Sequence, residues 1–144
     1  MKTRYLALSL GIVFLLIGIM GFVPALRSLP SNAPDITVDA GYGYLLGLFP
    51  INVLHNIVHL TVGALGIFAY FSGVNGSRLF AQGLTIFYGA LAVMGLIPAT
   101  NTTFDLIPIF SNDVWLHAGT ALISGYFGFV APEKEESDAR TMQS

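Results

Sequence analysis

Four apolar runs dominate the chain, and stretches rich in turn-forming residues separate them. Each run is about 20 residues long, which is the length of helix needed to cross the roughly 30 Å hydrocarbon core of a bilayer. The interiors of the runs contain no Lys, Arg or Glu. The pattern predicts four transmembrane helices at about residues 5–26, 50–71, 77–97 and 112–130.

Composition agrees with this pattern, because 54% of the 144 residues are hydrophobic and only 10% are charged. Four spans use most of the chain, so residues 1–144 are expected to form one all-α domain, an integral membrane four-helix bundle. The polar residues 132–144 are predicted to be a disordered tail.

The composition also excludes several kinds of site. The absence of cysteine excludes disulfides and thiolate metal sites. The net charge of −2 leaves no basic surface for nucleic acid.

Capping and first-turn residues predict where three helices begin. The expected signals are Pro50 in the first turn of the second helix, Ser77 as the cap of the third, and Ser111 or Asn112 as the cap of the fourth, with Asp113 in its first turn. Residues 72–76 are expected to form a tight link between the second and third helices.

Basic residues indicate how the helices cross the membrane. The N-terminus, the middle loop and the tail carry Lys2, Arg4, Arg78, Lys134 and Arg140, whereas the other two loops share only Arg27. Because loops rich in Lys and Arg stay in the cytoplasm, both termini are predicted to be cytoplasmic. A cleaved signal peptide is an alternative, since the basic start and the segment 23–25 resemble one.

The chain also contains an internal similarity. A shift of 74 positions aligns the first run with the third, including Arg4 with Arg78. A shift of 62 positions aligns the second run with the fourth, including His55 with His117. Two helices return a chain to its starting side, so the copies are expected to be tandem two-helix repeats in parallel orientation. The first run is then a retained helix rather than a signal peptide.

All three histidines lie within the predicted spans, where ionisable side chains are costly and face the bundle interior. Two polar stripes contain them: Asn52, His55, Asn56 and His59 on the second helix, and Asp113, His117 and Thr120 on the fourth. His55 and His117 each lie roughly 7 Å into their helices from the extracytoplasmic end. The two stripes are therefore expected to meet in the outer leaflet.

Three interpretations of the histidine cluster, which consists of His55, His59 and His117, remain open. The cluster could hold a transition-metal ion or the iron of a haem, because neutral imidazole ligates both. Asp113, one turn before His117, could then orient that imidazole. Alternatively, the two stripes could simply form hydrogen bonds between helices. The third interpretation is a proton relay or a small-molecule pocket.

Small and polar residues also mark the packing faces of the predicted helices. Close helix packing is expected at Gly63, Gly66, Gly125 and Gly128, because glycine lets backbones approach one another. A modest polar stripe of Gln82, Thr85 and Tyr88 on the third helix could face the same interior.

Residues 52–63 have the sequence Asn-x-x-His-Asn-x-x-His-Leu-x-x-Gly. This motif resembles the signature of a family of small bacterial four-span membrane proteins that is known only as a domain of unknown function. The resemblance extends from the first span to the fourth. It implies the membrane architecture and carries no activity with it.

The sequence therefore predicts a small multi-pass protein of a bacterial inner or internal membrane, surrounded by the lipid bilayer. A non-catalytic accessory or structural component of a membrane complex is the favoured function, with other membrane subunits or a second copy as partners. The alternative is a haem- or metal-binding protein for electron transfer or ion handling. A proton or small-molecule relay is the further alternative. No catalytic residue is assigned, and enzymatic activity is not expected.

Overall fold

The structure, a computed structural model, describes residues 1–132. The predicted disordered tail, residues 132–144, lies outside the described residues except for Pro132. The described part of the chain is mostly helical. Its helices are α1 (Lys2–Gly21), the short 3-10 helix η1 (Pro24–Leu26), α2 (Val53–Phe71), α3 (Gly73–Leu96), α4 (Asn112–Gly125) and the π-helix η2 (Tyr126–Val130).

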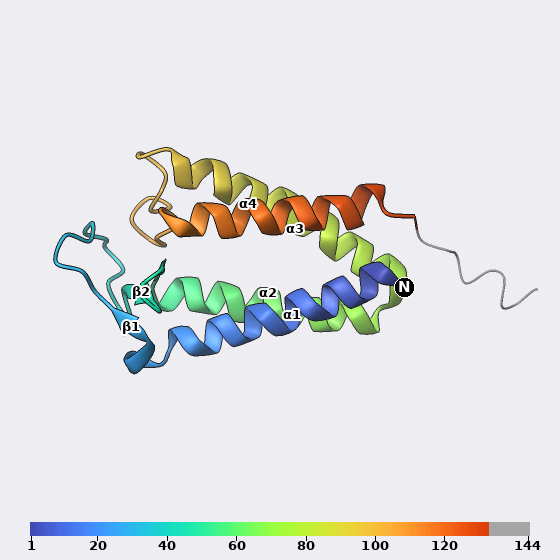
Figure 1. Cartoon of the computed structure of the whole chain (residues 1–144), viewed down its shortest axis with the longest axis horizontal. Helices are drawn as coiled ribbons and strands as arrows, with labels where there is room; N and C mark the ends of the chain where they lie inside the picture. The colour runs from blue at the N-terminus through green and yellow to red at the C-terminus, as the bar shows by residue number, and fades with distance from the viewer. Residues whose placement is uncertain (133–144) are drawn as a thin grey trace, which may run out of the picture.

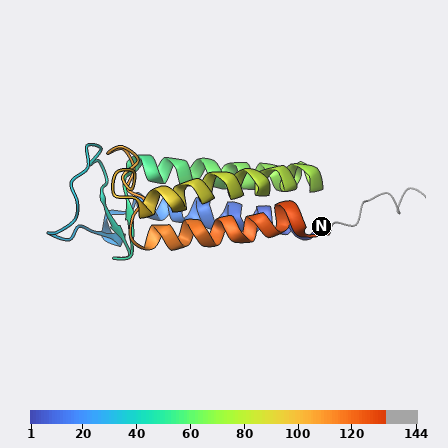
Figure 2. The same cartoon turned by 90° about the horizontal axis from the view of Figure 1, so that it is seen from above.

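The four α-helices lie side by side, with α1 packed on α2 and α3 packed on α4 (Figure 1). The long loops that join α1 to α2 and α3 to α4 lie at one end, which we call the loop end. The N-terminus, the α2–α3 connection and the end of η2 lie at the opposite end, as the view from above also shows (Figure 2). A hydrogen bond from the Thr3 hydroxyl to the Phe127 carbonyl, at 3.5 Å, joins the first and last helical segments there.

Three helices, α1, α2 and α3, are long and apolar enough to cross a membrane. The fourth predicted span, residues 112–130, is divided between α4, with 14 residues, and η2, with 5 residues, which follows it directly. Large apolar side chains also point outward: Phe68 is 70% exposed, Ile86 71% and Leu122 76%. Apolar surface of this extent is typical of a protein that contacts lipid or partners, so the chain has the character of a membrane protein.

Glycines bring α1 and α2 into close contact. A Cβ atom on Gly66 would lie 2.8 Å from the Ala7 carbonyl oxygen, and one on Gly63 would lie 2.8 Å from the Gly11 carbonyl oxygen. The glycines that face α3 differ from each other in how closely they pack. A Cβ on Gly128 in η2 would lie 3.0 Å from the Gln82 backbone nitrogen, whereas a Cβ on Gly125 in α4 would meet only a side chain, at 3.4 Å. Three of the four glycines therefore lie against the backbone of a neighbouring helix.

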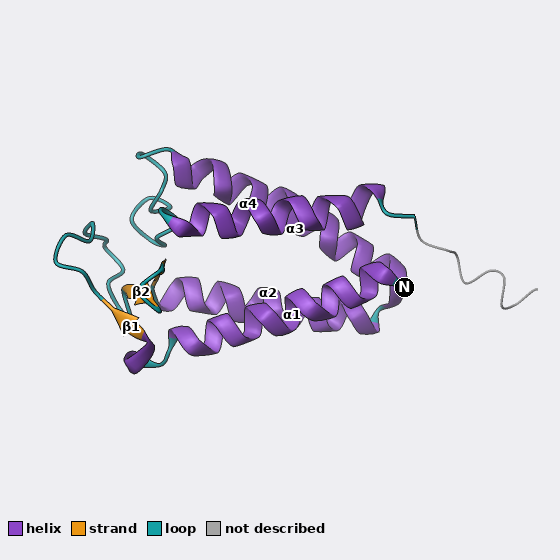
Figure 3. Ribbon diagram, viewed as in Figure 1, coloured by secondary structure: helices purple, strands orange, loops and turns teal. Residues whose placement is uncertain are grey.

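The loop end contains a small antiparallel sheet, coloured orange in Figure 3. Its strands β1 (Arg27–Ser28), β2 (Gly43–Leu45) and β3 (Phe49–Ile51) are hydrogen-bonded in the order β1-β2-β3. The prediction of a purely helical chain did not include this sheet, because strands of two or three residues are too short to show an alternating pattern. Pro50 lies in β3 and not in the first turn of α2, which begins at Val53.

The predicted start of the third helix was also wrong. Only Ser72 separates α2 from α3, so the expected link at residues 72–76 is mostly helical. Ser77 lies inside α3, where its hydroxyl donates a 2.9 Å hydrogen bond to the Ala69 carbonyl instead of capping a helix. Ser111 is the residue before α4, but its side chain makes no capping hydrogen bond.

The glycine contacts generate a stability prediction. Gly66→Ala should lower the free energy of unfolding by about 1–3 kcal/mol, because the added methyl group overpacks a backbone contact. Gly119→Ala is the matched control, since a Cβ there meets nothing within 4 Å. That variant should be neutral or slightly stabilising. Unfolding in detergent with increasing SDS measures both, and equal effects at the two positions would contradict the packing account.

Candidate functional site

A cavity of about 220 Å³ lies near the loop end and is lined by residues of α2, α3, α4 and the loop before α4. His55, His59, His117 and Tyr88 are among the residues that line it, and the rest of the lining is mostly apolar. All four side chains are buried, and His117 is 0% exposed. The structure thus brings together the three histidines that the sequence placed on separate helix faces.

The imidazoles are close enough to share a ligand. Each of the three histidines contributes one ring nitrogen to a group of three atoms that lie within 4.8 Å of one another. The ring centroids of His55 and His59 are 4.4 Å apart, and those of His55 and His117 are 6.1 Å apart. Ligands about 2.0–2.1 Å from one tetrahedral ion lie about 3.4 Å apart, so the rings would close up by up to about 1.4 Å around an ion.

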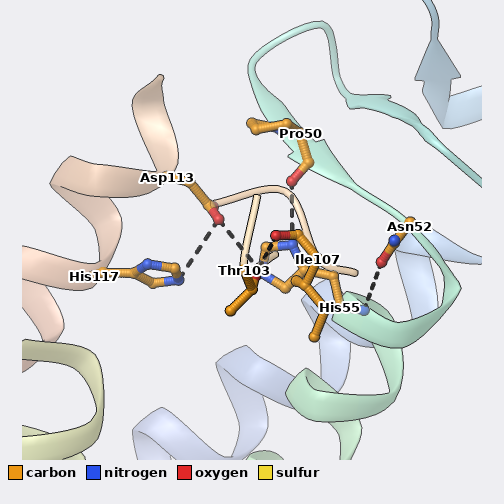
Figure 4. Close-up of polar contacts among 7 residues, drawn as sticks. All are labelled: Pro50, Asn52, His55, Thr103, Ile107, Asp113 and His117. Atoms are coloured by element: carbon orange, nitrogen blue, oxygen red, sulfur yellow. Dashed lines mark hydrogen bonds and ion pairs between the residues drawn. The ribbon is translucent and has the colours of Figure 1, made fainter. Parts of the chain in front are cut away.

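Asp113 lies between two of the histidines (Figure 4). Its Oδ2 atom is 3.4 Å from Nε2 of His55 and 3.6 Å from Nε2 of His117. The carboxyl group was expected to face His117, one turn away on the same helix, and it also reaches His55 on α2. It therefore supplies a potential negative charge to the centre of the cluster.

A backbone carbonyl fixes the orientation of His55. The Nδ1 atom of His55 lies 3.2 Å from the Pro50 carbonyl oxygen in β3. Because a carbonyl only accepts, Nδ1 must carry the proton, and in the neutral ring Nε2 then presents its lone pair to the cluster. Histidines that bind metals typically have their other ring nitrogen held in this way.

Several buried polar atoms in the cluster have no hydrogen-bond partner within residues 1–132. They are both ring nitrogens of His59, both ring nitrogens of His117, both carboxyl oxygens of Asp113 and the Tyr88 hydroxyl. An unsatisfied buried polar group costs roughly 1–3 kcal/mol, and more if it is charged. So many unsatisfied polar atoms in one place indicate that a ligand, an ion or water binds there and interacts with them.

Asn52 does not line the cavity, although it belongs to the same polar stripe of the second helix as His55 and His59. Its side-chain oxygen accepts a 2.9 Å hydrogen bond from the His55 backbone N–H and so caps α2. Its Nδ2 atom donates to the carbonyls of Val38, at 2.9 Å, and Leu106, at 2.7 Å. Asn52 therefore ties both long loops to the start of α2, beside the cluster.

The other two supporting residues point elsewhere. Asn56 is packed against α1, where a Cβ on Gly21 would clash with its Oδ1 atom. The Thr120 hydroxyl donates to the Leu116 carbonyl of its own helix, at 2.9 Å. Neither side chain lines the cavity.

Aromatic rings and a loop complete the site. Tyr88 lies 5.1 Å from His117 and is stacked on Phe14, also at 5.1 Å between centroids. The polar stripe on the third helix indicated Tyr88, but no pattern indicated Phe14. The loop before α4 covers the cavity with Thr103, Ile107 and Ile109. Its Thr103 hydroxyl donates to the Ile107 carbonyl (Figure 4).

Fold and site together define a helical membrane protein with a buried cluster of histidines and one aspartate. The chain belongs to the family described as Domain of unknown function (DUF4383), whose model matches residues 4–130. The match covers α2, α3, α4 and all of α1 except its first two residues, and it confirms the predicted membership of a family of unknown function. Comparisons with curated proteins and with solved structures found no match.

The role of Asn52 can be tested by stability. Asn52→Ala should lower the free energy of unfolding by about 2–4 kcal/mol, because it removes a helix cap and two hydrogen bonds to loop carbonyls. Asn112→Ala is the matched control, since its single bond to the Leu48 carbonyl is exposed. That variant should change stability by less than about 0.5 kcal/mol. Similar losses in both variants, measured by SDS unfolding, would refute the loop-tying role.

Proposed function

We propose that this chain is a multi-pass membrane protein that binds one transition-metal ion through His55, His59 and His117. The observation that carries the proposal is that the three buried histidines each have a ring nitrogen within 4.8 Å of the others, beside a buried carboxyl group, and that the ring nitrogens of His59 and His117 make no hydrogen bond in residues 1–132. Imidazole suits zinc, copper, iron and nickel, and three imidazoles leave a fourth position of a tetrahedral ion open. Asp113 would either fill that position or balance the charge of the ion.

Haem is a less suitable occupant. The cavity of about 220 Å³ is smaller than the sites of roughly 300–1,000 Å³ that hold drug-sized ligands, and a haem is a large ligand. The accessory-subunit hypothesis and the proton-relay hypothesis remain predictions, and no contact in residues 1–132 favours either of them over the ion.

The proposal includes a four-span bundle made of two tandem repeats. Buried positions of α1 recur 74 residues later in α3: Thr3 and Ser77, Ala7 and Ala81, Phe14 and Tyr88, Gly18 and Ala92, Gly21 and Gly95. Two pairs of equivalent residues also meet directly, Phe14 with Tyr88 and His55 with His117. Contacts between equivalents are expected where a two-fold axis passes, so the cluster would lie on the axis that relates the repeats.

We test the ion site by metal analysis of the protein purified in mild detergent. The wild type should carry about one transition-metal ion per chain and should be stabilised by added Zn²⁺. His59→Ala and His117→Ala should each weaken Zn²⁺ binding at least tenfold, because each removes a ligand. Thr120→Ala is the control and should bind as the wild type does, since its hydroxyl bonds within its own helix.

Two results would overturn the ion site. The first is a wild-type protein that holds no ion and is not stabilised by Zn²⁺ or Co²⁺. The second is a gain of stability in His59→Phe together with unchanged metal content, because that result would mean that His59 only fills space.

We also propose that both termini face the cytoplasm. Among the basic residues of the described chain, Lys2 and Arg4 lie in the first turn of α1 and Arg78 lies near the start of α3, at the end opposite the loops, whereas Arg27 lies in β1 at the loop end. Because the chain has no cysteine, a single introduced thiol reports its own side of the membrane. In right-side-out vesicles an impermeant maleimide should label Ser31→Cys and should not label Asn75→Cys. The reverse pattern would invert the topology.

A further inference from the structure

A second hollow continues from the histidine cavity along the helices. It is an apolar groove of about 400 Å³ between α2 and α3, lined by residues such as Val58, Leu65, Gly83 and Phe87. Val58 and Phe87 line the cavity as well as the groove. The two hollows are therefore neighbours along one helix interface.

From this geometry we infer that a lipophilic molecule of the isoprenoid quinone class enters between α2 and α3. Its head group lies in the histidine cavity and its tail lies in the groove. The inference rests on the proposed function in one respect, because the imidazoles or the ion they hold would face the oxygens of the head group.

The walls of the cavity favour a flat, neutral head group. Tyr88 and Phe87 supply aromatic surface, and aromatic rings attract one another in stacked or edge-on arrangements. The ring nitrogens of His59 and His117, which make no hydrogen bond in residues 1–132, are the groups that would pair with quinone oxygens or quinol hydroxyls. An uncharged head group suits this buried cavity, because taking the anionic head of a fatty acid or the charged head of a phospholipid out of water is costly.

The groove suits the tail. Its lining from Val58 to Leu65 is almost wholly apolar, and the Thr61 hydroxyl is bonded to the Ile57 carbonyl of its own helix at 2.9 Å. From the level of His55 to that of Leu65 the helix rises about 15 Å. The tail would thus run from the site near the loop end toward the middle of the bilayer.

The experiment measures saturable binding of radiolabelled decylubiquinone to the full-length protein in detergent. Gly83→Phe should fill the groove without a clash, because a Cβ on Gly83 meets nothing within 4 Å. Gly119→Phe is the matched control, with the same open surroundings on α4, outside the groove. We expect Gly83→Phe to weaken binding at least tenfold and Gly119→Phe to leave it within twofold of the wild type.

Equal affinities in the three proteins, or no saturable binding to the wild type, would overturn the inference. Displacement by palmitate at the same concentration would also overturn it, because the groove would then hold an acyl chain. If Gly83→Phe does not fold, Thr61→Phe tests the opposite wall. Metal content is measured in every sample, so a metal-free wild type that still binds decylubiquinone would refute the ion site alone.

Discussion

The burial of three imidazoles and a carboxyl group at the starts of α2 and α4 is the constraint on which the site depends. These groups are shielded from solvent, and most of their polar atoms have no hydrogen-bond partner in the described chain. Two contacts join the α2 side of the cluster to the α4 side: Asp113 reaches His55, and Asn52 ties the loop before α4 to the first turn of α2. An arrangement that is costly in isolation is most simply explained by something that binds there.

The proposed repeat explains why one site forms instead of two. Equivalent residues meet at the proposed axis, but the copies differ at the positions that matter for binding. Asp113 corresponds to Ile51, His59 to Ala121, and Tyr88 to Phe14. One half of the bundle thus supplies the carboxyl group and the tyrosine, and the other supplies the second histidine. A symmetric scaffold would in this way hold an asymmetric set of ligands.

Much of the helical architecture could be predicted, because runs of about 20 apolar residues leave few alternatives. The spacing of His55, His59 and His117 also predicted that they would face the interior. Hydrogen-bond partners could not be predicted in the same way. Asn52 shares a helix face with the histidines, but its amide caps α2 and holds loops that come from distant parts of the sequence. The short strands and the loop over the cavity depend on such tertiary contacts, which periodicity does not reveal.

The most direct test of the central claim is X-ray absorption at the metal edge of the purified protein loaded with one equivalent of Zn²⁺ or Co²⁺. The account predicts nitrogen scatterers at about 2.0–2.1 Å, with the outer-shell signals of three imidazole rings. It also predicts that His59→Ala removes one ring from that spectrum. A first shell of water oxygens without imidazole signals would contradict the account.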